Sequence, residues 1–390
     1  MPLIHRGAPA PISGRRPVLA VVSDAVYPWH KGGKEMRYWA LNAGLARAGF
    51  DVHVYTMHWW DGPRDQVTDG VSYHAICRRR ELYTGDRRSI VQALVFAVAC
   101  LRLFGRRFDA IEADHMPYLQ LFPLRVVATL KRVPLFVTWH EVWGSAYWQE
   151  YLGPAGRVAA TLERLAMSLP DHIVAASTDT GRRLVDAGVA KEKVSVLPNG
   201  VDLEHLADVE PSAVDVDVVF VGRLLAHKNV DVLLEALALL GANGQRLSCT
   251  VVGEGPERDR LVDLARSLGI DSQVHFAGGI DDHADVVALM KAARVVAVPS
   301  VREGFGIVVL EALACGTPVV TSDHPDNNSR LLVNERTGVV CPATPAAVAA
   351  GIVAASDLAG FSDTDADVGR YTWEHVVAEA ARLYTPKGAA

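Results

Sequence analysis

Short runs of apolar residues alternate along the chain with stretches in which apolar residues recur at helical spacing. The run Val18–Val22 is continuously apolar and the runs Val216–Val221 and 134–139 are predominantly so, which is the pattern of parallel strands buried on both faces. Most of these runs are followed by a loop with glycine or polar residues and then by an amphipathic segment such as 34–48. The alternation predicts an α/β fold in which helices cover doubly wound parallel sheets.

This strand and helix pattern occurs twice, and 390 residues are enough for two domains that each have a core. The first residues are rich in Pro, Gly and Arg, and several acids together with Pro211 mark a linker near the middle of the chain. The predicted division is a flexible tail over 1–16, a Rossmann-like domain over 17–203, a linker over 204–215, a second Rossmann-like domain over 216–371 and an amphipathic C-terminal helix over 372–386.

The net charge of −6 conceals an asymmetry between the two halves of the chain. Residues 1–200 contain 25 Lys and Arg against 18 Asp and Glu, a net charge of +7. Residues 201–390 contain 14 against 27, a net charge of −13. We therefore expect the first half to meet an anionic partner, either a membrane surface or an acceptor that carries phosphate, and we expect no nucleic-acid partner.

An apolar segment over 90–104 is flanked by arginines within the stretch 78–107. It is shorter than the roughly 20 residues that a membrane-spanning helix needs. Basic flanks and an apolar face suit a helix that lies on an anionic membrane surface. The alternative is an ordinary core helix with solvated ends.

The five cysteines are widely scattered and form no C-x-x-C pair. This pattern favours a reducing cytoplasm and no structural zinc, and the tail over 1–16 lacks the apolar stretch of a signal peptide. The location predicted for the protein is the cytoplasm, with peripheral contact to the inner face of the membrane as an extension of the charge argument. We interpret Asp281, Asp282 and His283 as a helix N-cap cluster and assign no metal site.

Two carboxylates, Glu303 and Glu311, flank a turn that follows one predicted strand and opens a helix. In the segment Gly304-Phe305-Gly306-Ile307, glycines let backbone N–H groups approach a ligand, and the helix N-terminus favours an anion such as a diphosphate. Glu311 lies in an otherwise apolar helix and is predicted to be buried, so it needs partners such as sugar or ribose hydroxyls. The alternative interpretation is a structural Glu311 and a solvated Glu303.

Other candidate residues also follow predicted strands, where ligands bind in open α/β sheets. Arg223 and Lys228 come after Val216–Val221 and can clamp a diphosphate, although a random pair of this kind is usually solvated surface charge. His140 ends the strand 134–139. The aromatic faces of Trp59, Trp143 and Trp148 suit a carbohydrate-like acceptor, with loop packing or membrane contact as the alternative.

Glutamates separated by seven residues around Gly-Phe-Gly resemble the signature of retaining glycosyltransferases of family 4, which have the two-domain GT-B fold. The segments Gly222-Arg223-Leu224 with Lys228, Thr138-Trp139-His140-Glu141 and 198–202 (Pro-Asn-Gly-Val-Asp) extend the resemblance over most of the chain. Glu141 departs from it, because many relatives have Asp after the histidine.

The resemblance implies two Rossmann-like domains that face a central cleft, with the acceptor on the first domain and a nucleotide-sugar donor on the second. It implies that the C-terminal helix over 372–386 returns to the first domain. The residues implied to contact the donor are Gly32, Gly33, Arg223, Lys228, Gly253, Gly255, Gly278, Glu303, Gly304, Phe305, Gly306, Ile307 and Glu311, and His140 is implied to reach the donor sugar or the reacting centre from the first domain.

The implied activity is that of a metal-independent, cofactor-free hexosyltransferase that moves a sugar from a nucleotide diphosphate to an acceptor hydroxyl with retention. The acceptor class is a glycan, a glycolipid or a small glycoside. Two alternatives stay open at this point: a nucleotide-sugar epimerase with the same two-domain plan, and a transferase-like protein that binds a partner without catalysis.

Overall fold

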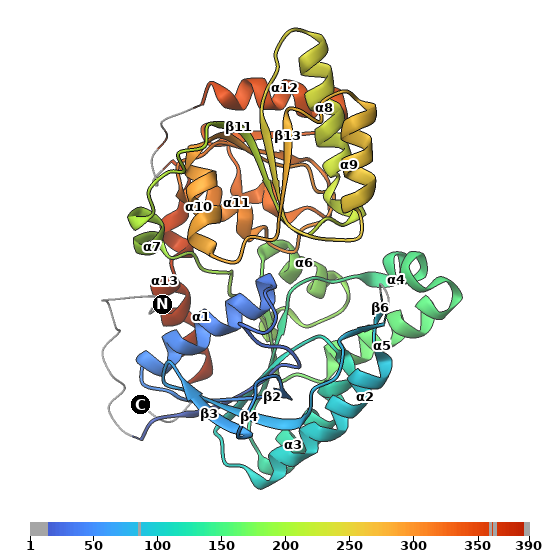
Figure 1. The fold of residues 1–390 in the computed structure, drawn as a ribbon. Helices are drawn as coiled ribbons and strands as arrows, with labels where there is room; N and C mark the ends of the chain where they lie inside the picture. The colour runs from blue at the N-terminus through green and yellow to red at the C-terminus, as the bar shows by residue number, and fades with distance from the viewer. Residues whose placement is uncertain (1–14, 85–86, 359–360, 362–364, 386–390) are drawn as a thin grey trace. The chain divides into compact units, whose positions relative to one another are not determined.

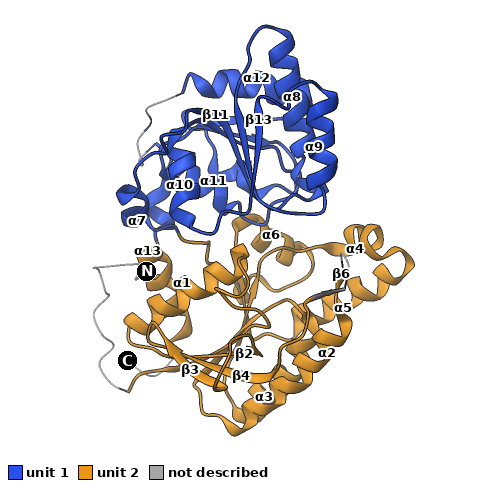
Figure 2. Cartoon of the chain, viewed as in Figure 1, with its two compact units in different colours: residues 1–5, 201–372 blue, residues 6–200, 373–390 orange. Residues whose placement is uncertain are grey.

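The computed structural model describes residues 15–84, 87–358, 361 and 365–385 (Figure 1). The described chain divides into two compact units (Figure 2). Unit 1 comprises residues 201–372, and unit 2 comprises residues up to Gly200 together with the segment from Trp373 onward. Nearly all of the predicted tail over 1–16 lies outside the described residues.

Unit 2 is built on an eight-stranded sheet in which one edge strand, β3, is antiparallel. The strand order is β10-β9-β8-β7-β1-β2-β4-β3. The strands are β1 (Val18–Val22), β2 (Asp51–His58), β3 (Asp65–Thr68), β4 (Val71–Arg78), β7 (Ala110–Asp114), β8 (Leu135–Trp139), β9 (His172–Ala175) and β10 (Val194–Val196). Its central strands are almost entirely buried, because helices cover both faces.

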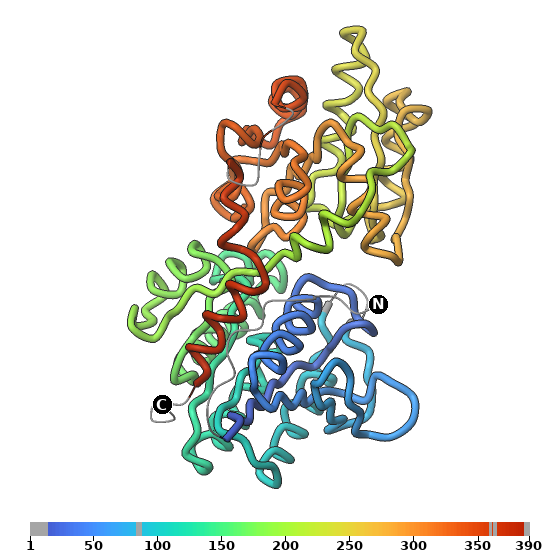
Figure 3. Tube along the Cα trace, turned by 90° about the vertical axis from the view of Figure 1, so that its left-hand side faces the viewer, coloured from blue at the N-terminus to red at the C-terminus, as the bar shows by residue number. Residues whose placement is uncertain are grey.

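The helices of unit 2 are α1 (Gly33–Arg47), α2 (Ile90–Ala99), α3 (Leu121–Lys131), α4 (Gly144–Leu152), α5 (Gly156–Ser168), α6 (Thr178–Asp186) and α13 (Trp373–Tyr384). The last of these, α13, lies beside α1 (Figure 3). The approach is close because Gly44 has no side chain: a Cβ atom there would lie 2.3 Å from Cγ2 of Val377. The ring of Tyr384 packs edge-on against Phe136 of β8, so α13 is part of the core of unit 2.

Unit 1 has a six-stranded parallel sheet with the order β13-β12-β11-β14-β15-β16. The strands are β11 (Val216–Val221), β12 (Cys249–Val252), β13 (Val274–Gly278), β14 (Ala293–Val298), β15 (Val319–Ser322) and β16 (Gly338–Cys341). The helices are α7 (Leu203–Asp208), α8 (Val230–Ala242), α9 (Arg258–Ser267), α10 (His283–Ala292), α11 (Ile307–Ala314) and α12 (Pro345–Ser356). Two apolar clusters fill the two faces of this sheet. Both units are Rossmann-like, which confirms the predicted α/β fold class.

Two segments differ from their prediction. Residues assigned to a linker over 204–215 begin with α7, which Asp202 caps by accepting a hydrogen bond from the backbone N–H of His205, and which buries Leu206. This part of the chain therefore belongs to unit 1. The apolar segment over 90–104 forms α2 followed by a 3₁₀ helix, η1 (Cys100–Gly105), so the helix is less regular than the periodicity predicts.

Both sheets reverse their strand order once, at the point where a doubly wound sheet opens a crevice. In unit 2 the reversal lies between β1 and β7, and in unit 1 it lies between β11 and β14. Residues that follow these strands are therefore brought together by the topology alone. Within the part of the chain that the structure describes, no helix combines the length and the apolar character that crossing a membrane would take.

Candidate functional site

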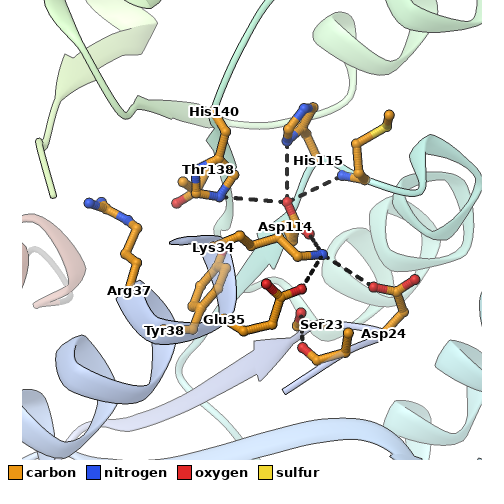
Figure 4. Close-up of polar contacts among 12 residues, drawn as sticks. Ser23, Asp24, Lys34, Glu35, Arg37, Tyr38, Asp114, His115, Thr138 and His140 are labelled. Atoms are coloured by element: carbon orange, nitrogen blue, oxygen red, sulfur yellow. Dashed lines mark hydrogen bonds and ion pairs between the residues drawn. The ribbon is translucent and has the colours of Figure 1, made fainter. Parts of the chain in front are cut away.

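A buried ionic cluster lies at the carboxyl ends of β1 and β7 in unit 2 (Figure 4). Nζ of Lys34, in the first turn of α1, is 2.5 Å from Oδ2 of Asp114 and 3.3 Å from Oδ1 of Asp24. The carboxylates of both aspartates are fully buried. The ammonium group thus bridges two buried anions across the point where the strand order reverses.

The cluster fixes its own protonation states. Burial alone would raise the pKa of Asp114, but the Lys34 ammonium and a hydrogen bond from His115 lower that pKa well below its usual range. Burial alone would lower the pKa of Lys34, whereas Asp114 and Asp24 raise it. Both groups are therefore charged at neutral pH, as an ion pair that the surrounding protein shields from water.

His140 follows β8, and its imidazole is neutral. Burial lowers the pKa of His140 to about 3, against the opposing attraction of Asp114. Its Nε2 atom lies 3.8 Å from Oδ1 of Asp114, too far for a hydrogen bond, and has no hydrogen-bond partner among the described residues. Thr180 donates to the backbone carbonyl of His140 at 3.2 Å and fixes the main chain there. The ring nitrogen is thus oriented but unused within unit 2.

A second layer of buried polar groups lies beneath His140. Glu112 on β7 accepts hydrogen bonds from Tyr38 at 3.0 Å and from Thr138. Burial raises the pKa of Glu112 to about 7. Arg37, also buried, donates instead to the backbone carbonyl of Leu197 at 2.9 Å. These bonds hold β7, β8 and α1 in register below the ionic cluster.

In unit 1 the predicted residues Lys228 and Glu303 meet directly. Nζ of Lys228 is 2.6 Å from Oε1 of Glu303, and both side chains are largely buried. The backbone of Glu303 is held from two sides: its N–H donates to the carbonyl of Asp326 and its carbonyl accepts from the N–H of Asn328. Asn328 also donates through Nδ2 to the carbonyl of Gly304 at 2.9 Å.

The turn from Gly304 to Ile307 opens α11 as predicted. Gly306 is the N-cap residue with φ of 91°, a conformation that favours glycine, and a Cβ atom there would lie 2.2 Å from Cβ of Ser329. The side chain of Phe305 is buried and packs against Tyr371, so its ring belongs to the core of unit 1. Any ligand contact of Phe305 is therefore through its backbone.

Glu311 is buried on α11, as predicted, and its partner is a histidine. Nε2 of His283 lies 2.9 Å from Oε1 of Glu311, and this hydrogen bond raises the pKa of His283. Asp282 accepts from the backbone N–H of Ala284 as the N-cap of α10, which confirms the N-cap interpretation of this segment. Among the described residues, no group of His, Cys, Asp or Glu is arranged to hold a metal ion.

The predicted glycines of unit 1 have a packing role. A Cβ atom on Gly253 would lie 1.9 Å from the carbonyl oxygen of Gly222, and one on Gly255 would lie 2.2 Å from that of Leu224. Gly278 accepts from the N–H of Gly253 and has φ of 72°. These glycines let the loops after β11, β12 and β13 run backbone against backbone. Arg223 lies on the first of those loops with an exposed side chain.

In unit 2, Gly32 is the N-cap residue of α1 and Gly33 is its first residue. A Cβ atom on Gly32 would lie 2.3 Å from Oε2 of Glu35, so the glycine leaves room for that carboxylate. The predicted contact of this turn with donor phosphates remains a prediction.

The three tryptophans predicted to face the acceptor differ in exposure. Trp59 is buried and its Nε1 donates to the carbonyl of Asp24 at 2.9 Å. Trp148 is buried and donates to Glu163 at 3.1 Å. Trp143 is partly exposed. The burial of Trp59 and Trp148 argues for a packing role. Of the three tryptophans, Trp143 is the one whose ring could contact an acceptor at the surface.

Sequence reasoning missed Asp24, Lys34 and Asp114, which form the ionic cluster. A usable signal was present, because Asp24 lies two residues beyond the strand Val18–Val22 and Asp114 ends the strand β7. Had the strand order been known, the rule that ligands bind beyond the carboxyl ends at the reversal point would have found both.

Comparison with known proteins agrees with this architecture in both units. A family described as "Glycosyltransferase Family 4" matches residues 31–205, and one described as "Glycosyl transferases group 1" matches residues 208–370. The D-inositol 3-phosphate glycosyltransferase of Kineococcus radiotolerans is 36% identical over 324 residues, which cover 75% of this chain and 73% of the relative. The glycogen synthase of Mycobacterium tuberculosis is 26% identical over 378 residues, 90% and 91% of the two chains.

Solved structures show the same fold. The sucrose-phosphate synthase of Thermosynechococcus elongatus superimposes with a TM-score of 0.76 at 22% identity and covers 95% of this chain and 98% of its own. HepE of Anabaena in complex with UDP-glucose gives a TM-score of 0.69 at 19% identity, with 94% and 98% covered. With a close relative matched over most of its length and family matches that together cover both units, the chain belongs to glycosyltransferase family 4, and it is a glycosyltransferase with the GT-B fold.

Proposed function

We propose that this glycosyltransferase moves a sugar from a nucleotide-diphosphate donor to an acceptor hydroxyl with retention of anomeric configuration and without a metal ion. The observation that carries the proposal is the pairing of Lys228 with Glu303 at the start of the turn that opens α11. A cation from the loop after β11 is thereby brought to a carboxylate on the loop after β14, beside the N-terminus of α11.

The chemistry of the donor explains why these groups belong together. Cleavage of the sugar–phosphate bond leaves negative charge on the diphosphate, and Lys228, Arg223 and the N-terminal backbone of α11 are the groups proposed to neutralise it. Glu303 then orients the sugar hydroxyls and Glu311 the ribose, with His283 holding the Glu311 carboxylate in place. Removing one preorganised group of this kind costs about 10²–10³ in kcat.

His140 has the protonation state for a polar contact with the sugar. A neutral imidazole with an unused, buried nitrogen can take part in a hydrogen bond with a hydroxyl without adding charge to the reacting centre. We propose that attack occurs on the face from which the diphosphate departs and that the leaving phosphate accepts the acceptor proton.

The acceptor is proposed to be carbohydrate-like or lipid-linked. Support comes from the basic N-terminal half and from the relative named for D-inositol 3-phosphate, a hydroxylated ring that carries phosphate. D-inositol 3-phosphate therefore belongs in the first acceptor panel, beside simple glycosides and lipid extracts.

The test begins with the donor. Thermal-shift measurements with UDP-, GDP-, ADP- and dTDP-sugars identify the nucleotide, because a ligand that binds the native state raises its apparent stability. Donor hydrolysis is then measured for Glu303→Gln and Lys228→Ala, with Glu335→Gln and Arg266→Ala as controls, since both control residues are exposed in unit 1. We expect the rate of donor hydrolysis to fall by about 10²–10³ in Glu303→Gln and Lys228→Ala and to stay unchanged in the two control variants.

Product analysis decides between the remaining functions. NMR of the glycoside formed with an acceptor reports the anomeric configuration, and an inverted product would contradict retention. Conversion of the donor into an epimer when no acceptor is present would identify an epimerase instead.

A further inference from the structure

The helix α2 and the following η1 present a stripe of large apolar side chains to the surface of unit 2. Along it, Ile90 is 72% exposed, Val98 is 67% exposed and Phe104 is 40% exposed. Val91, Leu94 and Leu101 are also exposed and fall at the same helical spacing. The opposite side of the helix, including Phe96 and Leu103, is fully buried in the core. The helix is therefore apolar on both sides, although only one side has a partner among the residues of unit 2 that the structure describes.

The neighbouring helix α3 extends the apolar surface. It packs beside α2 and η1, as Figure 1 shows, and exposes Val126 and Leu130. Lys131 at its end donates to the backbone carbonyl of Arg106, just beyond η1, at 2.6 Å. The two helices thus form one continuous surface, which we call the α2–α3 face.

The α2–α3 face is framed by positive charge. Residues 87–107 contain five arginines and no Asp or Glu, and residues 121–132 contain three cations and again no acid. Among these cations, Arg106, Arg107 and Arg132 are exposed. A second copy of the chain would bring the same exposed arginines, Arg106, Arg107 and Arg132, against these three, so the charge disfavours a dimer through this surface.

We propose that the α2–α3 face docks onto a phospholipid surface with anionic headgroups. The exposed aliphatic side chains would enter the boundary between headgroups and acyl chains, and the arginines would pair with lipid phosphates. Exposed apolar patches rimmed by cations mark such surfaces, because apolar burial and attraction to the anionic leaflet act in the same direction.

The docking helix is also bonded into the ionic cluster described above. Gln92 on the inner side of α2 donates through Nε2 to Oδ2 of Asp24 at 3.1 Å, and Arg88, just before α2, donates to the same oxygen at 2.9 Å. The lipid-binding helix and the cluster beside His140 are therefore parts of one rigid arrangement. Docking would hold that arrangement at the membrane surface, where a lipid-linked acceptor is found.

The experiment is cosedimentation of the full chain with large unilamellar vesicles of phosphatidylcholine, with and without equimolar phosphatidylglycerol, at 50 mM and 500 mM NaCl. We expect binding to the anionic vesicles at low salt that weakens at high salt. Leu94→Gln/Val98→Gln should lower the partition coefficient by about tenfold or more, since each apolar side chain contributes to insertion. Arg106→Gln/Arg107→Gln should lower it by roughly tenfold through charge alone.

The matched control is Leu239→Gln/Val353→Gln, which changes two exposed apolar residues on α8 and α12 of unit 1 and should bind as the wild type does. Unchanged donor hydrolysis shows that each variant is folded, and unchanged tryptophan fluorescence shows it in addition for the two α2–α3 variants, because all eight tryptophans lie in unit 2. The proposal fails if the wild type stays in the supernatant with anionic vesicles at low salt, or if both α2–α3 variants pellet as it does. It also fails if light scattering shows a dimer that Leu94→Gln/Val98→Gln converts to monomer, because the occupant is then a second copy.

Discussion

Replacing Lys34 by Met tests the ionic cluster of unit 2. The change keeps most of the side-chain volume and removes the ammonium that lies between Asp24 and Asp114. Asp24 retains Arg88 as a cationic partner at 2.9 Å. Asp114 is left with His115 at 3.2 Å and the neutral His140 at 3.8 Å. The perturbation therefore falls mainly on one fully buried carboxylate.

The expected loss of stability in Lys34→Met follows from the burial of the Asp114 carboxylate. At an effective dielectric constant of about 20, two unit charges at these distances attract by roughly 5 kcal/mol, and the cost of removing both from water offsets much of it. Breaking a buried pair by deleting one partner typically costs about 3–5 kcal/mol, because the other charge stays buried without compensation. Domains of this kind are stable by about 5–15 kcal/mol, so the variant should remain folded with a much lower urea midpoint.

Tryptophan fluorescence is the appropriate probe, since all eight tryptophans lie in unit 2. Urea titrations followed in this way report the unfolding of unit 2 without a contribution from unit 1. Lys191→Met is the control, because Lys191 is exposed, and it should change the free energy of unfolding by less than about 0.5 kcal/mol.

The double variant Lys34→Met/Asp114→Asn makes the reasoning refutable. If the loss arises from an uncompensated Asp114 charge, removing that charge should restore about 1–3 kcal/mol of the deficit. A Lys34→Met variant within 1 kcal/mol of wild type, or a double variant that is simply the sum of the two single changes, would refute the account of the cluster.

Three further changes test other features of the structure. In His140→Gln the free energy of unfolding of unit 2 should become less dependent on pH. The pKa of His140 is about 3 in the folded state and 6.5 in the unfolded state, so the wild type loses up to ~1.4 kcal/mol of stability per pH unit as the pH falls from 6.5 toward 4. An equal slope in the variant would show that this histidine does not titrate on unfolding. Glu163 accepts hydrogen bonds from Tyr118, Trp148 and the backbone N–H groups of Trp143 and Gly144. Glu163→Gln should therefore destabilise unit 2 by ~1–3 kcal/mol in urea titrations, whereas the control Glu150→Gln, at an exposed site, should not. Equal urea midpoints for the two variants would contradict the assigned hydrogen bonds. Gly306→Ala should lower the thermal midpoint of unit 1 more than Gly316→Ala does, as followed by circular dichroism. Both residues have positive φ, but only Gly306 is in close contact with Ser329. Equal shifts of the midpoint would count against that contact.

Local patterns predicted much of the fold because they depend on neighbours in sequence. The strands Val18–Val22 and Val216–Val221 were found with the predicted bounds, since predominantly apolar runs are what a sheet buried on both faces requires. The turn at Gly304–Ile307 and the burial of Glu311 were also predicted correctly, because a strand, a glycine turn and an apolar helix follow one another directly.

Features that depend on residues distant in sequence were not predictable in the same way. Lys34 and Asp114 are 80 residues apart, and nothing in either local sequence indicates that β1 and β7 are neighbours. The hydrogen bond between His283 and Glu311 was not predicted, because these residues are also distant in sequence. The acids of the predicted linker misled because the first of them, Glu204, lies in the first turn of α7, the helix that Asp202 caps.

The position of α13 affects the order in which the two units can fold while the chain is being synthesised. Unit 1 is an insertion: the chain leaves unit 2 after Gly200 and re-enters it at Trp373, and the two ends of the insertion are joined by a hydrogen bond from the N–H of Val201 to the carbonyl of Tyr371 at 2.7 Å. On a ribosome, the sheet of unit 2 emerges before unit 1 but lacks the helix that contributes Val377 and Tyr384 to its core until α13 (Trp373–Tyr384) has been made. Unit 1 can therefore complete its folding earlier than the sheet that precedes it, and a nascent chain stalled before residue 373 would expose apolar surface on α1 for a chaperone to cover.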